Sequence, residues 1–184
     1  AEAIHKLHRA NLPTERAHTM ADELRILREC FNKVAAQRPE WVGRLARLMV
    51  ACEKLGASVP STNGCGIHRD FYSSQVIVDG ARLWLIDFDL FCLGDPGLDV
   101  GNFLGHVREQ ALRERGDAKA LREVERVMEN RFVELSGERT RAAVRAYTTL
   151  TLARHVYLST QFAERVHTTE ALLELCERRV DQRP

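Results

Sequence analysis

Two short β-prone runs, residues 76–78 and 83–86, lie on either side of an Asp-Gly pair at 79–80 and constrain the fold more than any other feature. An Asp-Gly pair between such runs is typical of a tight hairpin turn. A hairpin brings its two ends together, so we expect residues 68–75 and 86–89 to become neighbours. Because a single hairpin is only marginally stable in water, we also expect it to pack on the rest of the chain.

The segments before and after this hairpin are predicted to be helical, because apolar residues recur there mostly every three or four positions, as on one face of a helix. These rows are Leu24, Leu27, Phe31 and Val34; Trp41, Leu45, Leu48, Cys52 and Leu55; Leu121, Val124, Met128, Phe132 and Leu135; Ala143, Tyr147, Leu150 and Phe162; and Leu172, Leu173, Cys176 and Val180. Pro39 separates the first two helices, and Gly137 can end the third. We expect every row to face a common core.

Composition excludes several classes of protein. The net charge is +1, which points to neither nucleic acid nor a membrane surface, and no apolar run approaches the ~20 residues of a membrane span. Five cysteines without a C-x-x-C pair favour reduced thiols in a cytoplasmic protein. All six acidic residues between 57 and 100 are Asp, on a Gly-rich stretch. Such a pattern suits a divalent cation bound with phosphate oxygens, although Asp and Gly also mark turns.

Polar side chains stand at both ends of the predicted hairpin. Asp70 and Gln75 precede it, and Asp87 follows it. Closing the hairpin allows all three to converge. A phosphoryl-transfer site needs one carboxylate near the attacking hydroxyl and further oxygen ligands for metal ions, and positioning with charge neutralisation supplies most of the rate. The spacing therefore indicates phosphoryl transfer.

Three ordered motifs resemble a known family. Residues 68–75 (HRDFYSSQ) are similar to H-G-D-x-x-x-x-N, residues 86–87 to I-D, and residues 94–100 (GDPGLDV) to G-D-P-x-x-D-L. Over about residues 68–102 the chain resembles the C-terminal lobe of the aminoglycoside phosphotransferase / choline kinase-like family. The resemblance implies a mostly helical α+β fold, that is, a protein kinase-like C-terminal lobe with a small β-hairpin at the catalytic loop. It also implies phosphotransfer from ATP or GTP with Mg²⁺.

The resemblance assigns roles residue by residue. Asp70 matches the catalytic Asp, which orients the acceptor hydroxyl and accepts its proton. Asp87 matches the Asp that bridges Mg²⁺ to the nucleotide phosphates. His68 would brace the loop, and Asp95 and Asp99 match acids that we expect to tie the loop backbone together.

Three positions depart from the family pattern. Gln75 stands where a second metal-binding Asn is usual; its carbonyl oxygen suits Mg²⁺, so it either keeps the ligand role or leaves a weakened second site. Arg69 replaces a Gly and stiffens the loop, and it is expected either to pair with an acid or to be solvated. Asp89 replaces the Gly of D-F-G and is either an auxiliary ligand or a solvated acid.

The remaining chain sets the expected domain and acceptor. Only seven residues separate Asp87 from Asp95, which leaves no room for a long activation segment and favours a small-molecule acceptor. The chain has no G-x-G-x-x-G and no V-A-I-K-like strand lysine. We therefore expect residues 1–184 to form a single kinase-like C-terminal lobe of a longer polypeptide, incomplete for activity without its N-terminal β lobe. The alternative is a natural lobe-only protein that binds nucleotide poorly.

The expected function is ATP- or GTP-dependent O-phosphotransfer to a small-molecule hydroxyl, with nucleotide-binding residues not indicated. The acceptor pocket would follow residue 100, where 15 Lys and Arg against 13 Asp and Glu do not favour a cationic aminoglycoside. A sugar, an amino alcohol or a phosphorylated metabolite fits as well. One alternative is a pseudokinase, a regulatory module that binds nucleotide or metabolite with a degenerate motif. Another is a purely structural helical domain.

Minor candidates carry two interpretations each. His5 and His8, at i and i+3, could face one metal ion or form a surface pair. Cys65 and Cys92 flank the motif region and could be oxidation-sensitive or simply packed. The alternating Arg and Glu residues after 107 are expected to form a solvated face.

Overall fold

The computed structural model describes residues 1–60, 62 and 64–181, and the mostly helical α+β class is confirmed. The α-helices are α1 (Glu2–His8), α2 (Met20–Gln37), α3 (Val42–Ala57), α4 (Pro96–Arg115), α5 (Arg122–Ser136), α6 (Thr140–Ser159) and α7 (Thr169–Asp181). The strands are β1 (Cys65–Ile67), β2 (Val76–Asp79), β3 (Arg82–Leu85) and β4 (Cys92–Gly94). Short 3₁₀ turns cover Pro39–Trp41, Ser73–Gln75 and Val166–Thr168.

Two antiparallel ribbons frame the motif region. The predicted hairpin is β2–β3, in which Val76 pairs with Leu85 and the turn contains Gly80 at φ 56°. The second ribbon pairs β1 with β4, and the sequence pattern did not predict it. Because β1 leads into the loop before β2 and β4 follows the loop after β3, the second ribbon clamps both loops.

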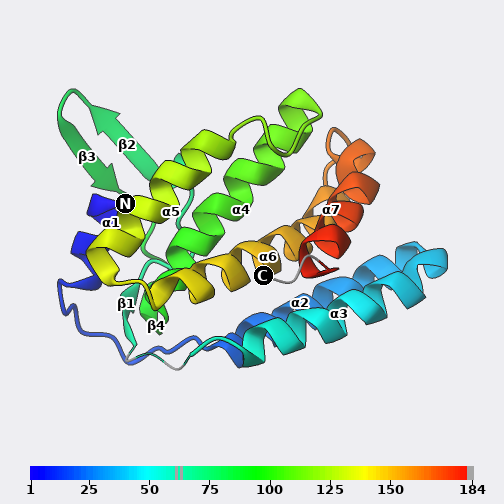
Figure 1. Cartoon of the computed structure of the whole chain (residues 1–184), viewed down its shortest axis with the longest axis horizontal. Helices are drawn as coiled ribbons and strands as arrows, with labels where there is room; N and C mark the ends of the chain where they lie inside the picture. The colour runs from blue at the N-terminus through cyan, green and yellow to red at the C-terminus, as the bar shows by residue number, and fades with distance from the viewer. Residues whose placement is uncertain (61, 63, 182–184) are drawn as a thin grey trace.

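The β2–β3 hairpin projects from the helical body near α1 and α5 (Figure 1). The expectation that it packs on the body is met only at its base, where Val76 and Leu85 are half-buried. Its other large apolar side chains are 42–67% exposed, namely Ile77, Val78, Leu83 and Trp84. A short two-stranded ribbon has two faces, and contact at one end covers neither of them. The hairpin therefore presents apolar surface to its surroundings.

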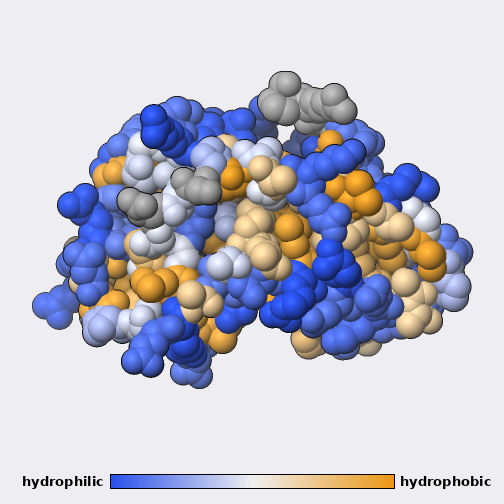
Figure 2. Space-filling view, turned by 90° about the horizontal axis from the view of Figure 1, so that it is seen from below, coloured by the Kyte–Doolittle hydropathy of each residue, from blue (hydrophilic) through white to orange (hydrophobic). Residues whose placement is uncertain are grey.

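The larger core lies among α2, α3, α6 and α7, and α2 and α3 run side by side (Figure 1). Helix α2 begins with a capping box in which Thr19 and Asp22 bond each other's backbone N–H. Its predicted row is buried at Leu27, Phe31 and Val34. On the face seen from below, hydrophilic residues surround separate hydrophobic patches (Figure 2). Of the helices in the described ranges, none is long and apolar enough to cross a membrane.

A smaller core supports the predicted catalytic loop, residues 68–75. Its buried members come from α1, the loop, α4, α5 and α6: Ile4, Phe71, Val100, Leu104, Phe132 and Val144. Helix α4 approaches α6 closely because glycines recur on its contact side. A Cβ added at Gly101 would lie 2.5 Å from the Tyr147 Cβ and 2.9 Å from the Val144 carbonyl oxygen. Helices α4 and α6 thus pack with their backbones close together, and the core that they share with Phe71 holds the loop in place.

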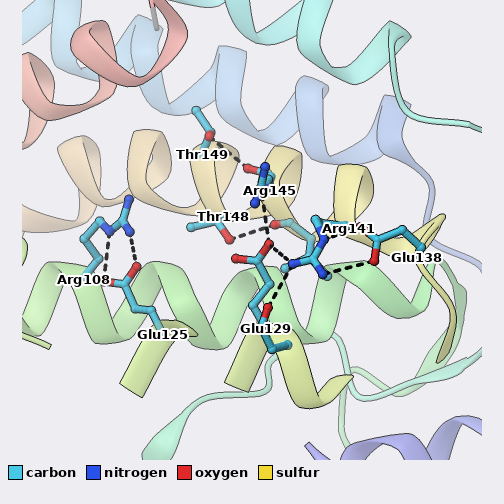
Figure 3. Close-up of polar contacts among 10 residues, drawn as sticks. Arg108, Glu125, Glu129, Glu138, Arg141, Arg145, Thr148 and Thr149 are labelled. Carbon is cyan, nitrogen blue, oxygen red and sulfur yellow. Dashed lines mark hydrogen bonds and ion pairs between the residues drawn. The ribbon is translucent and has the colours of Figure 1, made fainter. Parts of the chain in front are cut away.

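Ion pairs join α5 to its neighbours (Figure 3). Arg108 of α4 pairs with Glu125 of α5, and Arg141 and Arg145 of α6 both bond Glu129 of α5. The Glu125 side chain is buried. The expectation of a wholly solvated Arg/Glu face is therefore wrong here, because part of this face is the contact between helices.

Two predicted core positions lie elsewhere. Phe162 follows the end of α6 and is 45% exposed, because the chain turns away from the helix at Thr160. Val124 is 48% exposed and lines an open groove beside the hairpin. Gly137 does end α5, at φ 95°.

Candidate active site

The predicted catalytic loop, residues 68–75, is held by one buried carboxylate. Asp99, in the first turn of α4, is fully buried and accepts three hydrogen bonds. Its Oδ1 accepts the Arg69 N–H at 2.7 Å, and its Oδ2 accepts the His68 N–H at 2.9 Å and the His8 Nε2–H at 2.8 Å. The side chain therefore pins two consecutive peptide groups immediately before Asp70.

Further contacts fix both sides of the loop. His68 is buried, and its Nε2 donates to the Ile86 carbonyl at 2.8 Å, which ties the loop before the hairpin to the segment after it. Phe71 lies in the smaller core, and its carbonyl accepts from the Asn102 side chain at 3.1 Å. Asp70 lies between these anchored neighbours. Its side chain is half-buried, and among the described residues it accepts no hydrogen bond. The carboxylate is therefore available to a ligand.

The hairpin brings Gln75 and Asp87 together. The buried Gln75 donates from Nε2 to the Asp87 Oδ2 at 3.2 Å, and the Ile86 N–H donates to the Gln75 carbonyl at 3.1 Å. Asp87 is exposed and adopts φ 62°. A left-handed residue other than glycine costs about 1 kcal/mol or more, and such strain concentrates at functional sites. Asp70 is not bonded to either residue within the described chain.

Arg69 also adopts the left-handed region, at φ 71°. Glycine takes this conformation without a steric cost, which gives a physical reason for the Gly of the family pattern at this position. Burial tends to raise the pKa of Glu23, but a hydrogen bond from His18 and the charges of Arg154, His18 and Arg69 lower it overall. The Arg69 side chain therefore lies within electrostatic reach of a buried acid.

The other two predicted acids behave differently. Asp95 caps α4 by accepting the Gly97 N–H at 2.8 Å, and burial raises the pKa of its carboxyl. Asp89 is exposed, and its backbone carbonyl, not its side chain, accepts from Arg16 at 2.7 Å. Asp95 is thus built into the fold, whereas the exposed Asp89 carboxylate, near Asp87 in sequence, accepts no hydrogen bond from any residue that the structure describes.

Several supporting residues were missed by sequence reasoning. Arg16 holds the loop after Asp87, and Asn102 holds the loop after Asp70. Arg154 of α6 bonds Asn102 at 2.8 Å and the Glu23 carboxylate at 3.4 Å. These four contacts span 31 to 131 positions in sequence, so no local pattern could have indicated them.

The histidine pair and the two cysteines have structural roles. His8 donates to Asp99, whereas His5 bonds Ser136, so the two imidazoles have different partners. Across the described ranges, no group of three or more His, Cys, Asp or Glu residues could hold a metal ion by itself. Cys92 is buried, and burial raises the pKa of Cys65 to about 12, so both thiols are poorly suited to reaction.

An open groove of about 610 Å³ lies between α1, the hairpin and α5. Its lining is mostly apolar and includes Phe71, Leu83, Leu85 and Met128. Phe71 follows Asp70 directly, so the groove borders the catalytic loop. The candidate site thus contains the carboxylates of Asp70 and Asp87, and an apolar groove lies beside the loop that carries Asp70.

Comparison with known proteins agrees with this geometry. The family model of the phosphotransferase enzyme family (APH) matches residues 1–131, which include the catalytic loop, Asp87 and the Asp95–Asp99 segment. The chain therefore belongs to this kinase-like phosphotransferase family, and the resemblance expected from the motifs is confirmed. No curated protein matches the chain.

Proposed function

We propose that this chain is the catalytic lobe of an O-phosphotransferase, which moves the γ-phosphoryl group of ATP or GTP to the hydroxyl of a small molecule. The observation that supports this proposal most is the contact between Gln75 and Asp87 at the base of the hairpin. Beside it, hydrogen bonds with the Asp99 and Asn102 side chains hold the residues on both sides of Asp70. Membership of the phosphotransferase family supports the reaction class.

The proposed chemistry assigns the proton to Asp70. Its carboxylate accepts the proton of the acceptor hydroxyl while the hydroxyl oxygen forms a bond to the γ-phosphorus. The bond from that phosphorus to the β,γ-bridging oxygen breaks, and the nucleoside diphosphate leaves with the electron pair. The anchors at Asp99 and Asn102 keep Asp70 in place, which suits a reaction that depends on positioning.

The donor set fits Mg²⁺. Asp87 and Gln75 are hard oxygen ligands, and Mg²⁺ commonly takes one or two protein oxygens and completes its shell with phosphates and water. When bound with nucleotide, the ion neutralises charge on the phosphates. Gln75 presents its amide nitrogen to Asp87 here, so it would rotate its terminal amide to offer the oxygen.

We propose that a β lobe of the same polypeptide covers the nucleotide. The exposed apolar residues of the hairpin, including Ile77 and Trp84, support this because isolated apolar patches of this kind mark interaction sites. The groove beside Phe71 continues the same surface. We also propose a cytoplasmic location, supported by five free cysteines.

The test is phosphate transfer from γ-labelled ATP or GTP by the full-length protein to a panel of hydroxyl compounds. Asp70→Asn and Asp87→Ala should each reduce turnover by at least ~100-fold, as expected for loss of a general base or of the metal ligand. Asp117→Asn, an exposed change between α4 and α5, is the matched control. Near wild-type turnover in either site variant would refute the proposal.

One observation favours a second candidate, a nucleotide-binding pseudokinase. The Gln75 amide nitrogen bonds the Asp87 carboxylate, and this contact competes with a cation for the same oxygen. A pseudokinase would bind ATP with Mg²⁺, as seen by thermal shift, and transfer no phosphate to any acceptor.

A further inference from the structure

An aromatic stack extends from the catalytic loop into the space between α4 and α6. Tyr72, two residues after Asp70, stacks on His106 with ring centroids 4.5 Å apart and planes at 14°. His106 meets His155 edge-on, with centroids 4.6 Å apart. His155 is 2% exposed, and within the described chain its Nε2 has no hydrogen-bond partner. Buried polar atoms without a partner are uncommon and ask for an explanation.

A guanidinium group stands beside this stack and is tied to the loop. Arg154 precedes His155 on α6 and donates to the side-chain Oδ1 of Asn102 at 2.8 Å. Asn102 in turn donates to the Phe71 carbonyl at 3.1 Å. Arg154 is therefore two hydrogen bonds from the residue that follows Asp70, on the α6 side of the loop.

The charges that face the stack are predominantly positive. Besides Arg154, the guanidinium groups of Arg165 and Arg113 act on His155. Arg113 is paired with Glu109 at 3.0 Å, and Arg154 contacts Glu23 at 3.4 Å. Arg165 lies 4.8 Å from the Phe162 ring and has no ion pair within the described residues. Arg113, which also pairs with Glu114 at 3.4 Å, and Arg154 are thus compensated by acids, and within the described residues the unpaired positive charge beside the stack is that of Arg165.

The imidazoles act as neutral groups in this environment. Burial lowers the pKa of His106 to about 4, and the charges of Arg154 and Arg165 act in the same direction. Burial likewise lowers the pKa of His155. At neutral pH each ring therefore offers one N–H donor and one acceptor, while the arginines keep their charge.

We infer that the surface formed by Tyr72, His106 and Arg154 binds an anionic acceptor, a small molecule that carries a phosphate or carboxylate besides the hydroxyl that is phosphorylated. Guanidinium groups recognise such oxyanions with charge-assisted hydrogen bonds. A polycationic acceptor would face like charges there. Arg154, His155 and Arg165 lie beyond residue 131, where the family match ends. The inference rests on the proposed phosphotransfer.

The experiment compares matched acceptors with the full-length protein and labelled ATP with Mg²⁺. The pairs are glucose 6-phosphate against glucose and glycerate against glycerol, with ethanolamine and kanamycin as cationic acceptors. We expect kcat/KM to favour an anion over its neutral partner by at least about tenfold, the ratio that one charge-assisted hydrogen bond supplies. Both pairs are included because phosphate and carboxylate share this chemistry.

The variants separate binding from folding. Arg165→Gln should reduce the anion preference mainly through KM, and Arg154→Gln should do so more strongly. Because Arg154 also compensates Glu23, the stability of Arg154→Gln is first compared with that of wild type by urea unfolding. If Arg154→Gln is unfolded, the anion preference of Arg165→Gln alone decides the inference. Arg178→Gln, an exposed arginine of α7, should leave the preference unchanged.

A binding readout keeps the inference distinct from the proposed function. Glucose 6-phosphate or glycerate should shift the ring resonances of His106 and His155, and glucose or glycerol should not. Transfer to neutral or cationic acceptors without an anion preference would overturn the inference and leave the phosphotransferase proposal standing. Absence of transfer to every acceptor would overturn the phosphotransferase assignment. The shifts of the His106 and His155 ring resonances would then decide the anion site, and a lack of any shift with glucose 6-phosphate and glycerate would mean that the inference is wrong.

Discussion

Replacing Asp99 with Asn tests whether one buried carboxylate organises the catalytic loop. The carboxylate accepts three hydrogen bonds of 2.7–2.9 Å and is fully buried. Asn has the same shape but one acceptor oxygen, so its NH₂ group must face the N–H of Arg69 or the donors from His68 and His8. At least one charge-assisted bond is lost, at about 1.5–3 kcal/mol, and at least one buried donor is left unsatisfied, at about 1–3 kcal/mol.

The two effects together predict a loss of about 2.5–6 kcal/mol in the free energy of unfolding, a large part of the 5–15 kcal/mol typical of a domain. The assay is equilibrium unfolding in urea, with Asp89→Asn as the matched change at an exposed carboxylate, expected within about 0.5 kcal/mol of wild type. Phosphate transfer should fall as well, because either orientation of the Asn amide removes the bond to the backbone N–H of Arg69 or of His68, just before Asp70. A loss below about 1 kcal/mol for Asp99→Asn would refute this account.

Three further predictions concern the proposed metal ligand, helix packing and pH. Gln75→Asn should leave phosphate transfer similar or raised, and unchanged Mg²⁺ dependence in Gln75→Ala would exclude a ligand role. Gly101→Ala should cost about 1–3 kcal/mol in urea unfolding, because the added Cβ meets Tyr147 at 2.5 Å; an unaffected midpoint would contradict this packing. His106 binds its proton more weakly when folded, with its pKa lowered to about 4, so the unfolded chain takes up more protons below pH ~6.5. Stability should therefore fall from pH ~6.5 toward 4 by up to about 1.4 kcal/mol per pH unit from this group, and His106→Gln should flatten that slope.

Local patterns predicted much of the fold. The Asp-Gly turn forms the β2–β3 hairpin, and Pro39 and Gly137 interrupt the helices as expected. The β1–β4 ribbon was missed because each strand has only three residues, with a glycine in both. Such strands carry no readable alternation, and their pairing depends on a contact between distant parts of the chain.

The candidate site divides in the same way. Spacing around the hairpin predicted that Gln75 and Asp87 would meet, because a closed turn leaves their segments no alternative. It did not predict the anchors Asn102 and Arg154, or the burial of Glu23. Those contacts require α4, α6 and α2 to pack together, and a polar residue on a helix shows no sequence signal for the partner it meets across a core.

The sequence alone therefore determined most of the helices, the β2–β3 hairpin between them and the pair of groups at its base, since these follow from turn chemistry and short-range spacing, and the resemblance of its motifs indicated the family. The tertiary structure decided how Asp70 is held, which charges surround it and which apolar surfaces stay open. The physical reason is that a buried charge needs a partner, and which partner it finds depends on the packing of segments far apart in the chain.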